Sequence, residues 1–290
     1  MKGERRILIT GGGGQLARAV AERLAPRYRV LAPARGDLDI VDARAVREAV
    51  AAHRPDWIIN CAAYTAVDLA ESEKERAFLV NEAGVGNLAD AAADRGARLL
   101  HVSTDYVFDG HKDGPYVEDD PTGPLNVYGA SKLAGERRLQ GHPARSVILR
   151  TAWVYSEAGR NFLCRIVERG REAIAAGKPL PVVADQVGCP TDVHTLSAQI
   201  EEAIASDQSG LFHAAAVGSA SWYEFAGEIF RGLGLAPKLE KIRAAELSRP
   251  AVRPDRVILE NRNLNTLGRS RMVDWREGLR GVLARLGKRA

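Results

Sequence analysis

Two side chains in the middle of the chain are suited to moving a proton. Tyr128 and Lys132 stand four residues apart, so on a helix they share one face and can reach the same bound atom. A tyrosine hydroxyl ordinarily titrates near pH ~10, and an ammonium held nearby favours the phenolate and lowers that pKa. The pair therefore predicts a tunable acid or base, with Tyr128 and Lys132 as catalytic residues.

A second polar group stands in the run STDYVFDG. Ser103, Thr104 and Asp105 come at the end of the expected strand 98–103, and hydroxyls at the end of a central parallel strand lie where substrates bind. Thr104 could donate a hydrogen bond to a reacting carbonyl and hold that group against Tyr128. We expect Thr104 to be both catalytic and substrate-binding, and Asp105 to contact the substrate.

A phosphate-binding turn is predicted near the beginning of the sequence. The apolar run 6–10 stops at four glycines, after which 15–24 has helical periodicity. Strand, glycine turn and helix together aim free backbone N–H groups at a pyrophosphate. We expect this turn to bind a dinucleotide cofactor through four residues: Gly11, Gly14, Gln15 and Leu16.

The next strand, 28–32, is followed by two charges that bear on the cofactor. An arginine at this place can hold a 2′-phosphate, and an acid usually bonds the ribose 2′-OH. Arg35 favours NADPH and Asp39 favours NADH. The sequence predicts that both residues contact the cofactor and leaves NADPH or NADH open.

These residues require a scaffold that brings strand ends to one edge. Strands alternate with helices through residue 155, which predicts an α/β fold with a doubly wound, mostly parallel Rossmann-type sheet. We expect a dinucleotide-binding domain over 1–155, with returning segments around 180–217. Residues 156–290 would form mainly a smaller α/β substrate-binding cap. The expected strands are 6–10, 28–32, 57–61, 98–103 and 146–150, and the expected helices include 15–24, 42–53, 78–93 and 161–177.

Composition and charge exclude several classes of protein. The 290 residues carry a net charge of +4 with basic and acidic residues interspersed, which gives little support to nucleic-acid binding. Cys61, Cys164 and Cys189 lack metal-ligand spacing and are expected to be reduced core or pocket thiols. We expect no metal site. No apolar run approaches the ~20 residues of a membrane span, so the expected location is cytoplasmic.

The motifs together resemble a known family. PLNVYGASKLAGE, with its Tyr-x-x-x-Lys pattern, and STDYVFDG resemble the short-chain dehydrogenase/reductases, in particular the extended, sugar-nucleotide branch. With RTAWVY and DQVGCPT added, the chain resembles the dTDP-4-dehydrorhamnose reductases from about residue 7 to residue 226. The resemblance implies that NADPH or NADH delivers hydride to a ketosugar carbon. It also implies that Tyr128 protonates the ketone oxygen, while Lys132 lowers the tyrosine pKa and holds the nicotinamide ribose.

The same resemblance assigns three more cofactor contacts. Ala62, Ala63 and Tyr64 stand in the NAAYT loop after the strand 57–61, and in the family this loop lies along the cofactor. Asn81 falls where the family often has a structural asparagine.

Two further residues are substrate candidates. An aromatic just after a strand can form a flat wall against a sugar ring, which suggests Trp153, although a tryptophan at this place could instead seal a domain interface. Arg253 stands in SRPAVRPDR, a basic strip suited to a nucleotide diphosphate. Val257 occupies a position where the family usually has serine.

Alternatives to a reductase stay open. The scaffold also resembles sugar-nucleotide epimerases and dehydratases, which show no net redox change, and the non-catalytic regulatory subunit of methionine adenosyltransferase. The expected ligand is a nucleotide sugar, and a homodimer is compatible with the sequence.

Overall fold

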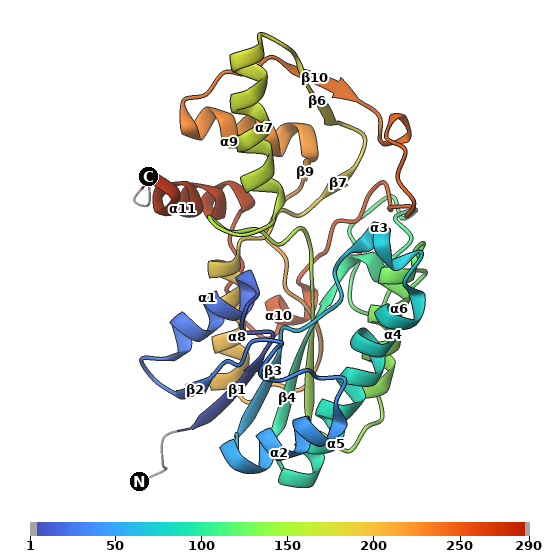
Figure 1. Cartoon of the computed structure of the whole chain (residues 1–290), viewed down its shortest axis with the longest axis vertical. Coiled ribbons are helices and arrows are strands. Elements are labelled where there is room, and N and C mark those ends of the chain that lie inside the picture. Colours follow the sequence, from blue (N-terminus) through green and yellow to red (C-terminus); the bar gives the residue numbers. More distant parts are fainter. Residues whose placement is uncertain (1–4, 288–290) are drawn as a thin grey trace.

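Six parallel strands form the main sheet of the structure, a computed structural model that describes residues 5–287 (Figure 1). Their spatial order is β2-β1-β3-β4-β5-β8, and every neighbouring pair is parallel. The strands are β1 (Arg6–Thr10), β2 (Arg29–Leu31), β3 (Trp57–Asn60), β4 (Arg98–Thr104), β5 (Ser146–Thr151) and β8 (Gly210–His213). The predicted Rossmann-type sheet is confirmed.

Helices cover both faces of this sheet because its central strands are apolar on both sides. Ile7 and Ile9 pack toward one face, with residues of α1 (Gln15–Leu24) and α8 (Val193–Ala205). Leu8 packs toward the other, with residues of α2 (Ala43–His53) and α5 (Gly84–Arg95). This alternation is the two-residue period of a strand, and Figure 1 shows the two helical layers on either side.

The long connection between β3 and β4 holds one helical irregularity. α3 (Val67–Ala70) and α4 (Lys74–Phe78) lead into a π-helical turn, η1 (Leu79–Ala83), which continues as α5. π turns inside helices are rare, and those that do occur often lie at functional sites. This one places the predicted structural asparagine, Asn81, in a buried position.

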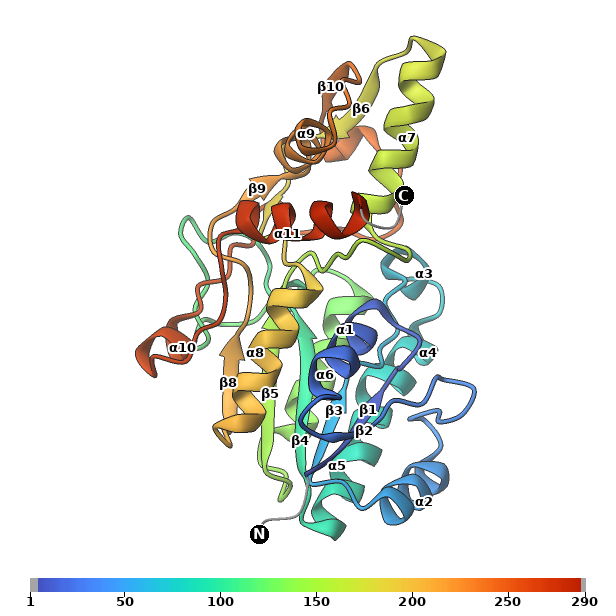
Figure 2. The same ribbon diagram turned by 90° about the vertical axis from the view of Figure 1, so that its left-hand side faces the viewer.

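A second lobe stands over the carboxyl edge of the sheet (Figures 1 and 2). Phe225, Phe230 and Trp275 are central to its separate apolar core. Its elements are α7 (Phe162–Ala176), β6 (Leu180–Val183), β7 (Val187–Gly188), β9 (Ala220–Ser221), α9 (Trp222–Leu233), β10 (Leu239–Ile242), η3 (Ala244–Glu246) and α11 (Trp275–Gly287).

The chain crosses between the lobes more than once. β6, at the start of the predicted returning segment, pairs with β10 in the upper lobe, whereas α8 and β8 lie with the main sheet. α10 (Arg262–Thr266) also belongs there, because Leu264 is buried in the core beneath α1 and α8. Residues 156–290 therefore contribute to both lobes.

Within residues 5–287 no helix is long and apolar enough to cross a membrane. The same part of the chain contains no group of three or more His, Cys, Asp or Glu side chains arranged to hold a metal ion.

Candidate active site

The glycine turn leaves the beginning of α1 open to a ligand. Gly11 has a φ of 72°, a conformation that glycine adopts without steric cost, and its carbonyl accepts a hydrogen bond of 2.8 Å from Gly14 N–H. No side chain caps the helix, so its first N–H groups remain available to an anion. The Gln15 side chain instead donates to the Val154 carbonyl at 3.0 Å. These features fit a cofactor pyrophosphate.

A cleft of about 1160 Å³ runs from this turn across the carboxyl edge of the sheet. Its walls include every cofactor residue that the sequence predicted and three of the four predicted substrate residues, Thr104, Asp105 and Trp153. The fourth, Arg253, lines a small adjoining pocket. The structure thus brings residues from across the chain into one continuous site. The predicted cofactor residues in its walls are Gly11, Gly14, Gln15, Leu16, Arg35, Asp39, Ala62, Ala63, Tyr64, Tyr128 and Lys132.

Arg35 and Asp39 pair with each other at one end of the cleft. Arg35 donates two hydrogen bonds of 3.3 Å to one carboxylate oxygen of Asp39. Both side chains are exposed, so little opposes a rearrangement of the pair. A bound 2′-phosphate or 2′-hydroxyl could therefore recruit either partner.

Asn81 ties the cofactor loop to the helix of Tyr128. Its carbonyl oxygen accepts from Tyr64 N–H at 2.8 Å, and its amide nitrogen donates to Tyr64 O at 3.1 Å and to Ser131 Oγ at 2.9 Å. Ser131 lies in α6 (Val127–Leu139). The π turn thus fixes both walls of the cleft relative to each other.

α6 presents Tyr128 to the end of β4. The helix is capped by Asn126, whose side chain accepts from Gly129 N–H at 2.8 Å. A side chain at Gly129 would collide with the carbonyl of Tyr106 in η2 (Asp105–Val107). Glycine therefore lets α6 approach η2 closely, and the rings of Tyr106 and Tyr128 meet edge to face with centroids 5.5 Å apart.

Tyr128 keeps its proton in this environment. Burial raises the pKa of its phenol, a hydrogen bond with Thr104 opposes that shift, and the nearby Asp105 and Tyr106 add to it. Lys132, which the sequence hypothesis expected to lower this pKa, is not among the groups that shift it, and burial sets the direction. A neutral phenol is the form that donates a proton.

Lys132 lies one helical turn after Tyr128 in α6, with only 2 % of its surface exposed. Its Nζ donates to the Val102 carbonyl at 2.7 Å. Burial lowers the pKa of Lys132 to about 8, while Glu136 and Cys61 act in the opposite direction. Lys132 is therefore held rigidly and can lose its proton more easily than an exposed lysine.

Thr104 and Asp105 form a hydrogen-bonded pair next to Tyr128. Thr104 Oγ1 donates to Asp105 Oδ1 at 3.0 Å and accepts from Tyr106 N–H at 3.2 Å. Burial raises the pKa of Asp105 to about 7, despite its hydrogen bonds. Near neutral pH this carboxyl can therefore offer a substrate either a donor or an acceptor.

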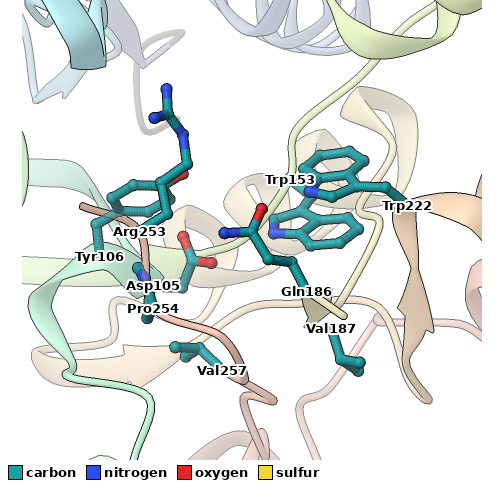
Figure 3. Close-up of a pocket in the computed structure, with 9 residues that line it drawn as sticks. All are labelled: Asp105, Tyr106, Trp153, Gln186, Val187, Trp222, Arg253, Pro254 and Val257. Atoms are coloured by element: carbon teal, nitrogen blue, oxygen red, sulfur yellow. The ribbon is translucent and has the colours of Figure 1, made fainter. Parts of the chain in front are cut away.

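The small pocket beside these residues is closed by two stacked indoles (Figure 3). Trp153 follows β5 with a φ of 45°, an uncommon conformation for a bulky residue. It stacks on Trp222 at the beginning of α9. A side chain at Gly188 would collide with the Trp153 indole. The ring therefore joins the two lobes and also lines the site, where its contact with a sugar stays a prediction.

Arg253 forms the opposite side of the small pocket, across from the indoles (Figure 3). Its Nη1 and Nη2 donate to the two carboxylate oxygens of Asp68 at 2.9 and 2.8 Å. Val257 is 2 % exposed and adds an apolar surface at the position where the family resemblance led us to expect serine. A polar substrate group therefore finds no side-chain partner at Val257.

Several site residues were not assigned a role from the sequence. Gln186 and Trp222 line the small pocket, although both stand in segments that matched the family pattern. Four buried polar residues near Lys132 were also missed: Asn60, His101, Glu136 and Arg150. Their only signal in the sequence is that they interrupt otherwise apolar strands and helices.

The three cysteines are free. Burial raises the pKa of the Cys61 and Cys189 thiols to about 12 and also raises the pKa of Cys164. They are therefore protonated at neutral pH and poorly suited to act as nucleophiles.

Comparison with known proteins gives a consistent result. Residues 5–288 match the family model described as RmlD substrate binding domain. The chain is 40% identical to a dTDP-4-dehydrorhamnose reductase of Sinorhizobium fredii over 289 residues, which covers 96% of each protein. It is 38% identical to a dTDP-4-keto-6-deoxy-D-glucose reductase of Streptomyces niveus over 279 residues, covering 94% of this chain and 95% of that protein.

A solved structure agrees with these relatives. The crystal structure of a dTDP-4-dehydrorhamnose reductase from Bacillus anthracis in complex with NADP superposes with a TM-score of 0.93. It is 36% identical in sequence and the match covers 97% of this chain and 99% of that one. The likeness therefore extends over both lobes.

Proposed function

The chain belongs to the family of the RmlD substrate binding domain, and from this we propose that it reduces the C4 ketone of dTDP-4-dehydro-L-rhamnose to give dTDP-L-rhamnose. The relatives that carry this activity in their names match nearly the whole length of the chain. The protein is accordingly an NAD(P)H-dependent oxidoreductase, with a nucleotide sugar as substrate.

One observation carries the proposal beyond family membership. Tyr128, Thr104 and Lys132 line the large cleft, which shares Asp105 and Trp153 with the adjoining small pocket. A ketone at this junction would lie within reach of a neutral phenol and of a threonine hydroxyl. The arrangement supports proton donation to an oxygen that gains charge.

Each of these residues has a separate role in the proposed reduction. When bound, the reduced nicotinamide supplies the hydride. Tyr128 gives its hydroxyl proton to the former ketone oxygen, so that C=O becomes CH–OH. Thr104 turns its hydroxyl from Asp105 to that same oxygen and orients it. Lys132 fixes the nicotinamide ribose from the floor of the cleft.

Residues around the small pocket would hold the rest of the substrate. Trp153 offers a flat apolar face to the sugar ring, and Asp105 exchanges hydrogen bonds with a sugar hydroxyl. Arg253 would contact the diphosphate, for which its Asp68 partner keeps the guanidinium extended.

Turnover with purified substrate tests this assignment. We expect one NADPH or NADH to be oxidised for each dTDP-4-dehydro-L-rhamnose consumed, with dTDP-L-rhamnose as the product. Conversion of the sugar without net cofactor oxidation would indicate an epimerase or dehydratase. Cofactor binding without any turnover on this sugar or on dTDP-4-keto-6-deoxy-D-glucose would favour a regulatory subunit.

Two properties follow from the proposed reaction as further proposals. Synthesis of an activated sugar from soluble precursors fits the cytoplasm, and fractionation of cells would test this. A homodimer is compatible with the sequence, and light scattering on the purified chain would measure the assembly.

A further inference from the structure

A row of buried polar groups leads from the first strand of the sheet to Lys132. Thr10 Oγ1 donates to Asn60 Oδ1 at 2.7 Å, Asn60 Nδ2 lies 3.0 Å from His101 Nδ1, and His101 Nε2 lies 3.3 Å from Lys132 Nζ. Thr10, Asn60 and His101 are completely buried. They stand on β1, β3 and β4, so neighbouring strands hold the row in place.

The backbone fixes the orientation of the Asn60 amide. Ala62 N–H, which can only donate, gives a hydrogen bond of 3.1 Å to Asn60 Oδ1. The Asn60 Nδ2 group must therefore face His101, and because an amide NH₂ can only donate, His101 Nδ1 must accept. Turning the amide over would place two donors against each other at Ala62.

This hydrogen bond selects one form of the imidazole. Burial and the charge of Lys132 lower the pKa of His101 well below its ordinary value, so the ring is neutral and carries one proton. With Nδ1 accepting, that proton sits on Nε2. His101 therefore presents an N–H group, rather than a lone pair, to Lys132.

An N–H group facing Lys132 Nζ favours one protonation state of the lysine. An ammonium has three donors and no lone pair, so it cannot accept from His101. A neutral amine can accept this bond while it still donates to the Val102 carbonyl at 2.7 Å. The contact at 3.3 Å is a hydrogen bond only when Lys132 has given up a proton.

We propose that Asn60 and His101 are positioning residues that stabilise the amine form of Lys132, so that this lysine resupplies Tyr128 with a proton during turnover. This inference rests on the proposed reductase function. The proton leaves Lys132 Nζ and forms the O–H bond of Tyr128, either directly or through a hydroxyl between them. The nitrogen lone pair that remains accepts from His101 Nε2–H.

Two other titratable groups around Lys132 act against this effect. Glu136, one turn along α6, and Cys61, after β3, both favour the ammonium. Glu136 is largely occupied, because Arg150 donates to both of its oxygens and Ser103 to one. Burial of the ammonium and the His101 N–H group remain as the features that favour the amine.

Nitrogen NMR on the wild-type chain tests the first step without turnover. With histidine labelled at both ring nitrogens, we expect a protonated Nε2 and an unprotonated Nδ1 for His101 at neutral pH. A His101→Leu sample assigns the signal. Protonation at Nδ1 instead would overturn the proposal, whatever the protein does with a ketosugar.

The pH dependence of turnover tests the second step. In the wild type kcat should fall as the pH rises through the pKa of Lys132, which is about 8. Asn60→Asp replaces the donor with an acceptor, so His101 must protonate Nδ1 and turn a lone pair to Lys132. We expect the basic limb of the pH profile, where kcat falls as the pH rises, to move to a higher pH by about one unit or more.

Two further variants separate this effect from a general change in the site. Thr10→Val removes a hydrogen bond to the same oxygen of Asn60 but leaves the Ala62 bond, and should leave the basic limb in place. In a His101→Leu background, Asn60→Asp should shift the limb by less than half as much as in the wild type. A full shift without His101, or no shift with it, contradicts the proposal.

Discussion

Trp153 and Trp222 stack face to face, with ring centroids 3.3 Å apart and ring planes 2° apart, although they belong to different lobes. The pocket that they close has a volume of about 10 Å³, room for one water molecule. This volume is too small for a sugar ring, so a sugar ring that contacts Trp153 would occupy the adjoining cleft of about 1160 Å³, which both indoles also line.

Replacing Trp222 should weaken substrate binding more than cofactor binding. Trp222→Ala removes the upper wall of the sugar pocket, and we expect about a tenfold rise in KM for the sugar nucleotide, comparable to the 0.5–1.5 kcal/mol of an aromatic pair. The dissociation constant for NADPH should change less than twofold. Tyr223→Ala is the matched control, because Tyr223 contacts Lys241 away from the pocket. Equal effects of both variants would mean that the stack has no role in substrate binding.

The Arg35–Asp39 pair should set the choice between cofactors. Arg35→Ala should lower kcat/KM for NADPH by about 10- to 100-fold, the value of a charge-assisted hydrogen bond, and spare NADH. Asp39→Ala should have its larger effect on NADH. Arg44→Ala breaks a similar pair with Glu48 that lies outside the cleft, and its cofactor preference should match the wild type. Equal losses with both cofactors would show that Arg35 does not contact the 2′ position.

The buried ion pair between Glu136 of α6 and Arg150 of β5 should be important for stability. Arg150 and Glu136 are 2.7 Å apart, with 3 % and 0 % of their side chains exposed. Arg150→Met leaves Glu136 charged and unpaired, and we expect the free energy of unfolding to fall by about 3–5 kcal/mol. Arg23→Met, which breaks a more exposed pair with Glu201, should cost less than about 1 kcal/mol. Urea unfolding of the two variants would contradict this account if their losses were equal.

Asp105 should make the protein less stable as the pH rises. Its pKa is about 7 in the folded chain, against an ordinary value of 3.8. The folded state therefore holds this proton more tightly than the unfolded state, and stability falls between about pH 4 and pH 7. Relative to wild type, Asp105→Asn should gain stability across this range, by on the order of 4 kcal/mol at most.

Asp109→Asn is a control for Asp105→Asn, because the pKa of Asp109 is shifted in the opposite direction. A hydrogen bond from Tyr116 lowers the pKa of Asp109, so its contribution to stability is lost as the pH falls. Thermal unfolding at several pH values should show slopes of opposite sign for the two comparisons. If the stability difference between Asp105→Asn and wild type did not change with pH, the Asp105 carboxyl would be ionised at every pH tested.

The sequence was sufficient for the main sheet and for most of the site. Strands 6–10 and 98–103 could be placed because they are apolar and end in glycine or hydroxyl residues. Parallel strands carry these ends to one edge, which predicts that Gly11 and Thr104 lie at the same edge, and the family resemblance added Tyr128 to them.

What the sequence did not reveal depends on contacts between distant segments. Trp222 reaches Trp153 only because α9 begins over the end of β5, and no local pattern encodes that meeting. The expected direction of the Tyr128 pKa shift was wrong because burial, which cannot be read from spacing, is the largest cause of that shift. His101 was read as part of an apolar strand, and its role emerges only from the Ala62 and Asn60 hydrogen bonds.

The most direct test of the central claim is turnover of dTDP-4-dehydro-L-rhamnose by wild type and Tyr128→Phe, with NADPH binding measured on both. Loss of general acid catalysis should reduce kcat by about 10²- to 10⁴-fold, with an unchanged dissociation constant for NADPH. Near-normal turnover by Tyr128→Phe, at the same cofactor affinity, would contradict the assignment of Tyr128 as the proton donor.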